Sequence, residues 1–267
     1  MSKKTPIPCP LHYLAEKLPG QDAIVWSCGR AMSWDTLNAY VHSTSRRLKE
    51  FGLGAGSRVA FLAPANVSYL ILLLALWRVK AVACPLNPKL PLETLKGVLD
   101  ILKPDLMILD KKCKDIPLRQ AFLDDMVLIE AVEGFFASAS GREEQIDLEQ
   151  DAAVILTSGS SGAFKPALLS YGNFYTNALG AHELIPFGRG DSWLLSLPLY
   201  HVSGLSIIFR ALVAGGTVIL PQGIGLADEI GRSRPTHISL IPTQLLGLLN
   251  DPFMVELLRG MKCILIG

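Results

Sequence analysis

The sequence has no long apolar run and no export signal, which argues against an integral membrane protein and against a secreted protein. Its most apolar stretch, residues 69–77, covers about nine residues, whereas a membrane-spanning helix needs roughly 20. We therefore expect a buried helix there and no integral membrane segment. The N-terminal stretch, residues 1–17, has a basic tip but lacks the apolar core of a secretory signal, so nothing in it directs export.

Cysteine pairs are also lacking. The five cysteines are far apart and none belongs to a C-x-x-C pair, which argues against a zinc site and a thioredoxin-like motif. We predict no metal bound by protein side chains. An odd number of scattered cysteines is typical of reduced thiols, so the sequence predicts a cytoplasmic protein.

Neither sign of charge is in excess. Lys and Arg number 25 against 24 Asp and Glu, the formal net charge is +1, and no basic run is interleaved with aromatic residues. Nucleic-acid grooves need such a run, so nucleic acid is not expected as a partner. The 267 residues are half hydrophobic, which is enough for the core of one large domain or two small ones.

What the sequence does contain is an alternation of short apolar runs with helix-length segments. This pattern is typical of strand-helix-strand units and predicts an α/β fold with doubly wound sheets. Ser33 and Asn66 are candidate N-caps of two early helices. The pattern weakens over residues 110–150, which we interpret as a connecting segment with irregular strands, between subdomains at about residues 1–150 and 151–267. The expected strands are residues 58–63, 81–86, 106–109, 152–156, 167–169, 193–197, 217–220, 237–241 and 263–267. The expected later helices are residues 69–77, 92–102, 205–213, 226–230 and 243–249, with another that begins at residue 171.

The most informative segment is Thr157-Ser-Gly-Ser-Ser-Gly-Ala-Phe-Lys165, directly after an apolar strand. Glycines let successive backbone N–H groups converge on an anion, hydroxyls donate further hydrogen bonds, and a lysine supplies a point charge. The segment therefore has the chemistry of a triphosphate cradle. It does not fit G-x-x-x-x-G-K-[ST], because only two residues separate Gly159 from Gly162, and a proline follows Lys165. The alternative is a flexible Ser/Gly turn between two strands.

The segment resembles the phosphate loop of the adenylate-forming, or AMP-binding, superfamily. That family usually has proline where Phe164 stands and glycine or alanine where Pro166 stands, and these departures could stiffen or reshape the loop. The resemblance implies that ATP, with Mg²⁺ carried on it, binds at the loop. The implied nucleotide-binding residues are Thr157, Ser158, Gly159, Ser160, Ser161, Gly162 and Lys165, and Lys165 is also given a catalytic role.

A second signature lies at residues 191–205, in the string Pro198-Leu-Tyr-His-Val-Ser-Gly204. With Arg210 and the string Leu240-Ile-Pro-Thr-Gln-Leu245, it resembles the o-succinylbenzoate–CoA ligases of menaquinone synthesis, most clearly from about residue 153 onward. The resemblance implies that His201 lies beside the acyl group and is catalytic. The implied substrate-binding residues are His201, Ser203, Gly204, Arg210, Thr243 and Gln244.

Each of these assignments has an alternative. Arg210 is the single charge of an apolar helix, and a buried guanidinium is costly without an anionic partner, so it is a candidate to hold a second carboxylate of the substrate. It could instead extend to the surface or pair with an internal carboxylate. His201 could be a hydrogen-bonded core histidine, and Thr243 could cap the helix that follows it, although side chains here face the ligand-binding edge of a sheet.

The activity that the resemblance implies is that of an ATP-dependent acid–thiol ligase. Such an enzyme activates a small carboxylic acid, here o-succinylbenzoate, as an acyl-adenylate and transfers it to coenzyme A. The resemblance also implies an incomplete N-terminal adenylation domain over residues 1–267, with two stacked subdomains, no small C-terminal domain, and a homo-oligomer as a weak expectation. The alternatives are another acyl- or aryl-CoA synthetase and a non-catalytic remnant that only binds ligand.

Overall fold

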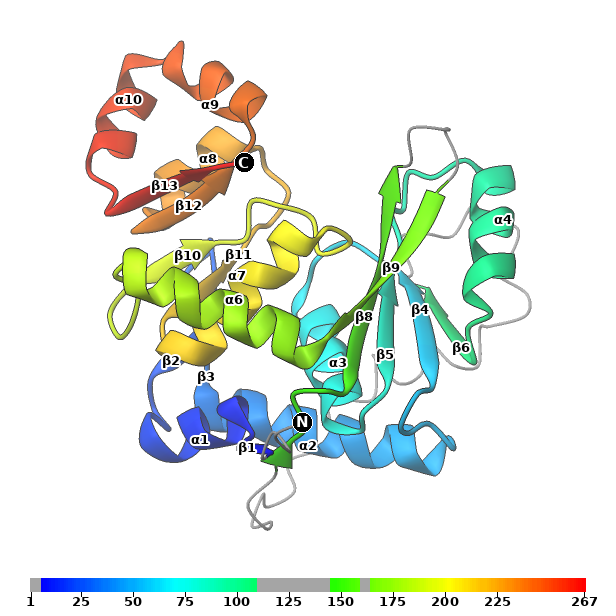
Figure 1. Cartoon of the computed structure of the whole chain (residues 1–267). Helices are drawn as coiled ribbons and strands as arrows, with labels where there is room; N and C mark the ends of the chain where they lie inside the picture. The colour runs from blue at the N-terminus through cyan, green and yellow to red at the C-terminus, as the bar shows by residue number, and fades with distance from the viewer. Residues whose placement is uncertain (1–5, 110–144, 159–163) are drawn as a thin grey trace. The chain divides into compact units, whose positions relative to one another are not determined.

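The computed structural model describes residues 6–109, 145–158 and 164–267, and its architecture is the predicted α/β class (Figure 1). The chain forms two compact units, each with its own sheet. Unit 1 consists of Met1–Cys9 and Asn38–Asn173, and unit 2 consists of Pro10–Leu37 and Phe174–Gly267. Helices α2 (Trp34–Glu50) and α6 (Tyr171–Leu184) each begin near a boundary between the units and continue across it.

Unit 1 is built on a five-stranded sheet with the strand order β6-β4-β5-β8-β9. The first four strands are parallel, and the edge strand β9 runs antiparallel to β8. A short antiparallel pair, β1 with β7, lies outside this sheet. The strands are β1 (Ile7–Pro8), β4 (Arg58–Leu62), β5 (Val82–Pro85), β6 (Leu106–Leu109), β7 (Gln145–Ile146), β8 (Asp151–Ser158) and β9 (Phe164–Ser170), and the helices between them include α3 (Val67–Arg78) and α4 (Leu92–Leu102).

Helix α3 is the buried helix predicted from its apolar run. The Asn66 side chain caps it, since Oδ1 accepts a hydrogen bond from the Tyr69 N–H at 2.8 Å. Every residue from Tyr69 to Trp77 is buried, and the Trp77 indole donates to the Ala152 carbonyl of β8 at 2.9 Å. The apolar run is therefore explained by burial on the sheet.

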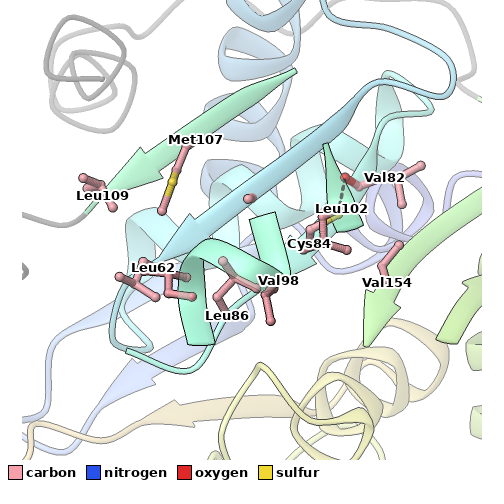
Figure 2. Close-up of a cluster of buried hydrophobic side chains, with 11 residues drawn as sticks. Leu62, Val82, Cys84, Leu86, Val98, Leu102, Met107, Leu109 and Val154 are labelled. Carbon is pink, nitrogen blue, oxygen red and sulfur yellow. Dashed lines mark hydrogen bonds between the residues drawn. The ribbon is translucent and has the colours of Figure 1, made fainter. Parts of the chain in front are cut away.

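Helix α4 completes the core on the other face of the sheet (Figure 2). Its buried side chains are Leu95, Val98 and Leu102, and they pack with residues of β4, β5, β6 and β8. Burial in this cluster raises the pKa of the Cys84 thiol to about 12, so this cysteine is an inert core residue. Below, "the α4 core" means this cluster, whose residues are Ala60, Leu62, Val82, Cys84, Leu86, Leu95, Val98, Leu102, Met107, Leu109 and Val154.

Unit 2 is built on a six-stranded sheet with the strand order β13-β12-β10-β11-β2-β3. All pairs are parallel except β2 with β3. Helices α8, α9 and α10 pack on one face, and Arg210 of α7 lies over the Trp193 ring of β10 on the other. The strands are β2 (Asp22–Trp26), β3 (Ala31–Ser33), β10 (Ser192–Leu194), β11 (Thr217–Leu220), β12 (His237–Leu240) and β13 (Cys263–Ile266), and the helices are α1 (Pro10–Lys17), α7 (Val202–Ala214), α8 (Leu226–Ser233), α9 (Pro242–Leu249) and α10 (Pro252–Arg259).

The two units differ in their bounds from the approximate subdomains expected from the sequence. Strands β8 and β9 pair with β5 and with each other, so residues 151–170 belong to unit 1. Strand β2 pairs with β11, so an early segment belongs to unit 2. The sequence-based interpretation missed α1, α10 and the strands β1, β2, β3 and β7. Most of the expected connecting segment, residues 110–144, lies outside the described residues.

Among the residues that the structure describes, no helix combines the length and the apolarity that a bilayer span requires.

Candidate functional site

The predicted phosphate loop lies at the end of the antiparallel pair β8 and β9. Thr157 is opposite Lys165, and Ser158 is opposite Phe164. The Thr157 hydroxyl donates a hydrogen bond to the Lys165 carbonyl oxygen at 3.0 Å, which ties the two strands together next to the loop. The loop residues for which no placement is described are Gly159, Ser160, Ser161, Gly162 and Ala163.

Lys165 is exposed, and it projects from the face of β9 opposite to that of Phe164, because successive side chains of a strand alternate. Within the described ranges, no carboxylate forms an ion pair with Lys165. An exposed ammonium without a protein partner is available to an anion such as a phosphate group.

Pro166 lies opposite Leu156 in β9. A proline lacks the N–H that a ladder uses and is tolerated in a sheet mainly on an edge strand. Strand β9 is such an edge strand, so this departure from the superfamily pattern is compatible with the sheet.

His201 is the N-cap residue of α7 and is exposed. Its backbone N–H donates to the Pro198 carbonyl at 3.1 Å, and its ring lies 4.7 Å from that of Tyr200, centroid to centroid. The alternative in which His201 is a buried core histidine is therefore wrong. An exposed imidazole at the start of a helix can contact a ligand.

Gly204 allows the first turn of α7 to pack on the preceding loop. A Cβ atom added there would lie 2.2 Å from the Pro198 carbonyl oxygen, a separation that no side chain tolerates. This close approach explains the glycine without a ligand, and its role in substrate binding remains a prediction. Ser203, beside it, is half-buried.

Arg210 lies two turns farther along α7, with Cζ 4.8 Å from the centroid of the Trp193 ring. Its Nε atom is buried and has no hydrogen-bond partner. Burial lowers the pKa of this guanidinium, and the neighbouring Cys263 opposes that shift. In the described part of the chain no carboxylate pairs with Arg210, so the alternative of an internal ion pair is not supported.

A hollow lies beside this guanidinium in unit 2. Its free space of about 180 Å³ includes open solvent, and the enclosed part, about 10 Å³, has room for about one water molecule. Its wall combines one cation with aromatic and small apolar side chains. The lining residues are Ala178, Ala181, His182, Ile185, Phe187, Trp193, Arg210 and Ala214.

Trp193 is fully buried and held in place by its neighbours. The indole N–H donates to Ser239 Oγ at 3.1 Å, and the ring stacks on His237, with centroids 5.1 Å apart. The His237 ring nitrogens contact Thr236 Oγ1 at 2.8 Å and the Pro186 carbonyl at 3.1 Å. Burial lowers the pKa of His237, so the imidazole is neutral at pH 7. The surface beneath Arg210 is thus rigid.

Thr243 and Gln244 lie in the first turn of α9, directly after β12. Gln244 Oε1 accepts a hydrogen bond from the Ile241 N–H at 3.0 Å, so Gln244 caps the helix. Thr243 is exposed and makes no capping bond, so the alternative in which Thr243 caps α9 is wrong.

The family of the chain follows from comparison with known proteins. The family model described as AMP-binding enzyme matches residues 11–267. The chain belongs to the AMP-binding enzyme family.

Two curated relatives of this chain are named 2-succinylbenzoate–CoA ligase. The chain is 33% identical over 236 residues to the 2-succinylbenzoate–CoA ligase of Escherichia coli strain K12, which covers 88% of this chain and 49% of the relative. It is 31% identical over 222 residues to the enzyme of the same name from Haemophilus influenzae, which covers 83% of this chain and 44% of the relative. The chain thus spans about half the length of the curated relatives it matches.

Solved structures of AMP-binding enzymes share this fold. The O-succinylbenzoate coenzyme A synthetase of Bacillus subtilis, in complex with AMP, matches with a TM-score of 0.83 at 24% identity, over 98% of this chain and 68% of that one. ATP-bound MatB from Rhodopseudomonas palustris matches with a TM-score of 0.81 at 26% identity, over 98% of this chain and 55% of that one. At 24% identity, the likeness to the Bacillus subtilis structure is evidence for the fold alone. Together they confirm the predicted architecture of an adenylate-forming enzyme.

Two features of this AMP-binding chain were missed by reasoning from the sequence. The first is the aromatic surface under Arg210, made by Trp193 and His237 from different strands. The second is the burial of Phe164, which the sequence analysis treated only as a departure from a motif. An aromatic residue that opens a predicted strand, as Trp193 does, was the available signal for the first feature.

Proposed function

We propose that this chain provides the triphosphate and acid sites of an ATP-dependent acid–thiol ligase whose acid is o-succinylbenzoate. The observation that carries this proposal is Arg210, a desolvated guanidinium over the Trp193 ring beside an open hollow. A second carboxylate on an aromatic acid supplies the partner that this cation lacks.

The proposed reaction has two steps. A carboxylate oxygen of the acid attacks the α-phosphorus of ATP, the bond to the bridging oxygen breaks, and pyrophosphate leaves. The thiolate sulfur of coenzyme A then attacks the acyl carbon, and AMP leaves with the electrons of the broken C–O bond. Both steps depend mainly on alignment and on neutralisation of charge.

Lys165 and the loop before it serve the first step in this proposal. The exposed ammonium neutralises charge on the β- and γ-phosphates, and the hydroxyl groups of Ser158, Ser160 and Ser161 and the backbone N–H groups of the loop donate hydrogen bonds to them. Mg²⁺ is carried on the nucleotide, where phosphate oxygens are its preferred ligands. It withdraws charge from the triphosphate when bound.

His201 and Arg210 serve the acid in this proposal. About 12 Å of helix α7 separates the start of the helix, after His201, from Arg210, since the rise is 1.5 Å per residue. In this proposal His201 lies beside the reacting carboxylate and Arg210 binds the second carboxylate. The names of the curated relatives support the same acid. Ser203, Gly204, Thr243 and Gln244 complete the proposed acid site.

A pair of nucleotide analogues tests the acid assignment. The first is an o-succinylbenzoyl-sulfamoyl-adenosine, and the second is its benzoylpropionyl counterpart, which lacks only the ring carboxylate. We expect the first to raise the melting temperature of the chain more than the second, because binding to the folded state alone stabilises it by mass action. Equal shifts, or none with either compound, would contradict the assignment.

The Arg210→Met variant is the matched test of the residue itself. We expect it to remove the difference between the two analogues and to leave the response to the benzoylpropionyl compound unchanged. Exchange of labelled pyrophosphate into ATP, measured over a panel of fatty, aryl and dicarboxylic acids, tests catalysis separately. Exchange that is fastest with a simple fatty acid would favour another acyl-CoA synthetase.

The same proposal places the protein in the cytoplasm and makes it a homo-oligomer. The scattered cysteines support the cytoplasmic assignment, since the four in the described part of the chain are free thiols, and so does a biosynthetic substrate. Cell fractionation and sedimentation velocity test these two statements.

A further inference from the structure

Phe164 links the predicted phosphate loop to the core of unit 1. It is one of three partly buried hydrophobic residues that pack against the α4 core; the other two are Leu99 and Leu156 (Figure 2 shows the core itself). Phe164 is also the first residue of β9, so it enters the core at the point where the chain leaves the loop.

The position of Lys165, in the ladder pair next to that of Phe164, depends on the packing of Phe164. Phe164 opposite Ser158 is the last described pair of the ladder, and Lys165 opposite Thr157 is the next one. Strand β9 is the edge strand of the sheet as described, so none of the other described strands pairs with its outer side. Pro166 has no N–H to add to the ladder. Packing of Phe164 therefore adds to the restraint that pairing with β8 and the Thr157 hydroxyl place on the loop end of β9.

We propose that Phe164 is a positioning residue for Lys165. With the partly buried aromatic ring packed against the α4 core on one face of β9, alternation keeps the lysine on the opposite face, next to Thr157. The ammonium is thus presented to a triphosphate before the ligand arrives. This inference rests on the proposed function of Lys165.

Positioning matters because lysine has a long flexible stem. If the backbone at Lys165 frays, both the backbone and the side chain must be ordered when the ligand binds. The conformational entropy lost in this ordering weakens the affinity. A residue that only stabilised the fold would change the melting temperature and leave the affinity of the folded molecules unchanged.

The experiment compares Phe164→Ala with Leu99→Ala in the full chain. Both remove a partly buried hydrophobic side chain that packs against the same core, but Leu99 is on α4 and not on the strand that follows the loop. The probe is inorganic tripolyphosphate with Mg²⁺, measured by calorimetry at a temperature where each variant is folded. We expect Phe164→Ala to raise the Kd by about 2- to 10-fold, and Leu99→Ala to leave it unchanged. Phe164→Leu, which keeps an apolar anchor, should restore most of the affinity.

Hydrogen exchange supplies a readout that does not depend on the ligand. Amides at the loop end of β9 should exchange faster in Phe164→Ala than in Leu99→Ala at matched stability. Equal exchange and equal Kd in the two variants would overturn the inference.

Lys165→Ala separates this inference from the proposed function. If Lys165→Ala weakens tripolyphosphate binding while Phe164→Ala does no more than Leu99→Ala, only the positioning role is overturned. If the unchanged chain does not bind the probe, or Lys165→Ala binds it equally well, the triphosphate site fails and the positioning role fails with it.

Discussion

The two cations proposed to meet the substrates, Lys165 in unit 1 and Arg210 in unit 2, lie in opposite environments. Lys165 is exposed on an edge strand. Arg210 is half-buried over an indole, and its Nε has no partner. An exposed ammonium is hydrated at no cost, whereas a desolvated guanidinium lowers the stability of the fold until an anion pairs with it.

In the proposed sites, this difference means that the two cations gain affinity for a ligand in different ways. At Lys165 the protein must restrain a flexible chain, which the packing of Phe164 does from the other face of the strand. At Arg210 the restraint already exists, since the guanidinium lies over a buried Trp193 that is itself hydrogen-bonded to Ser239. Affinity there comes from an unpaired charge.

The largest expected effect comes from Gly204→Ala, which disrupts the helix that carries Arg210. The new Cβ would lie 2.2 Å from the Pro198 carbonyl oxygen, so α7 must move. We expect the free energy of unfolding to fall by about 3 kcal/mol. Urea denaturation measures this effect, and Gly180→Ala in α6 is the control, because nothing lies within 4 Å of its new Cβ. Gly180→Ala should stabilise the chain by up to about 1 kcal/mol. Equal effects of the two variants would show that α7 is not held by this contact.

Lys165→Ala should have the next largest effect, and on binding alone. Loss of a charged hydrogen-bond donor is expected to weaken binding of Mg²⁺-ATP by about 10- to 100-fold. The free energy of unfolding should change by less than about 0.5 kcal/mol, because the side chain is exposed. Calorimetric titration measures the affinity for Mg²⁺-ATP, and urea denaturation measures the free energy of unfolding. The exposed Lys49→Ala is the control for net charge. Parallel loss of stability and affinity would contradict a ligand role.

Arg210→Met compared with Arg78→Met sharpens the contrast between an unpaired and a paired arginine. The Arg78 guanidinium donates to Asn38 Oδ1 at 2.7 Å, so Arg78→Met should cost about 1–3 kcal/mol of unfolding free energy. Arg210→Met removes a desolvated charge that has no carboxylate partner and should be neutral or stabilising by about 1 kcal/mol. Thermal and urea denaturation measure both, and a larger loss for Arg210→Met would mean that this arginine has a structural partner.

The smallest expected effect is the pH dependence that arises from His237. Desolvation is the main cause that lowers its pKa below 6.5, with Lys262 acting in the same direction and Asp191 and the Pro186 carbonyl opposing it. The unfolded chain therefore binds the proton more readily, and stability from this group is present above pH 6.5 and lost as the pH falls through the folded-state pKa. The slope attributable to His237 cannot exceed about 1.4 kcal/mol per pH unit. Urea denaturation from pH 7.5 to 5 should show a shallower slope in His237→Phe than in the unchanged chain.

Much of the fold was predictable because local signals and tertiary packing agree. The helix at residues 92–102 and the strand at 106–109 were predicted with the bounds that the structure has, and Asn66 caps its helix as expected. The pair β2 and β3 was missed because each strand is short and β2 is placed by β11, far along the chain. Helix α10 was missed, although Asp251 and Pro252 form a regular start.

The sequence by itself determined the α/β class, the phosphate-loop composition and the strings around His201 and Thr243, because these are properties of residues close together in the chain. Only the tertiary structure decided which residues surround the cations. Trp193 and His237 come to lie side by side through parallel pairing of β10 with β12, and Phe164 packs against a core built from five other elements. Register and packing between distant segments follow from the collective burial of apolar surface, which no local pattern encodes.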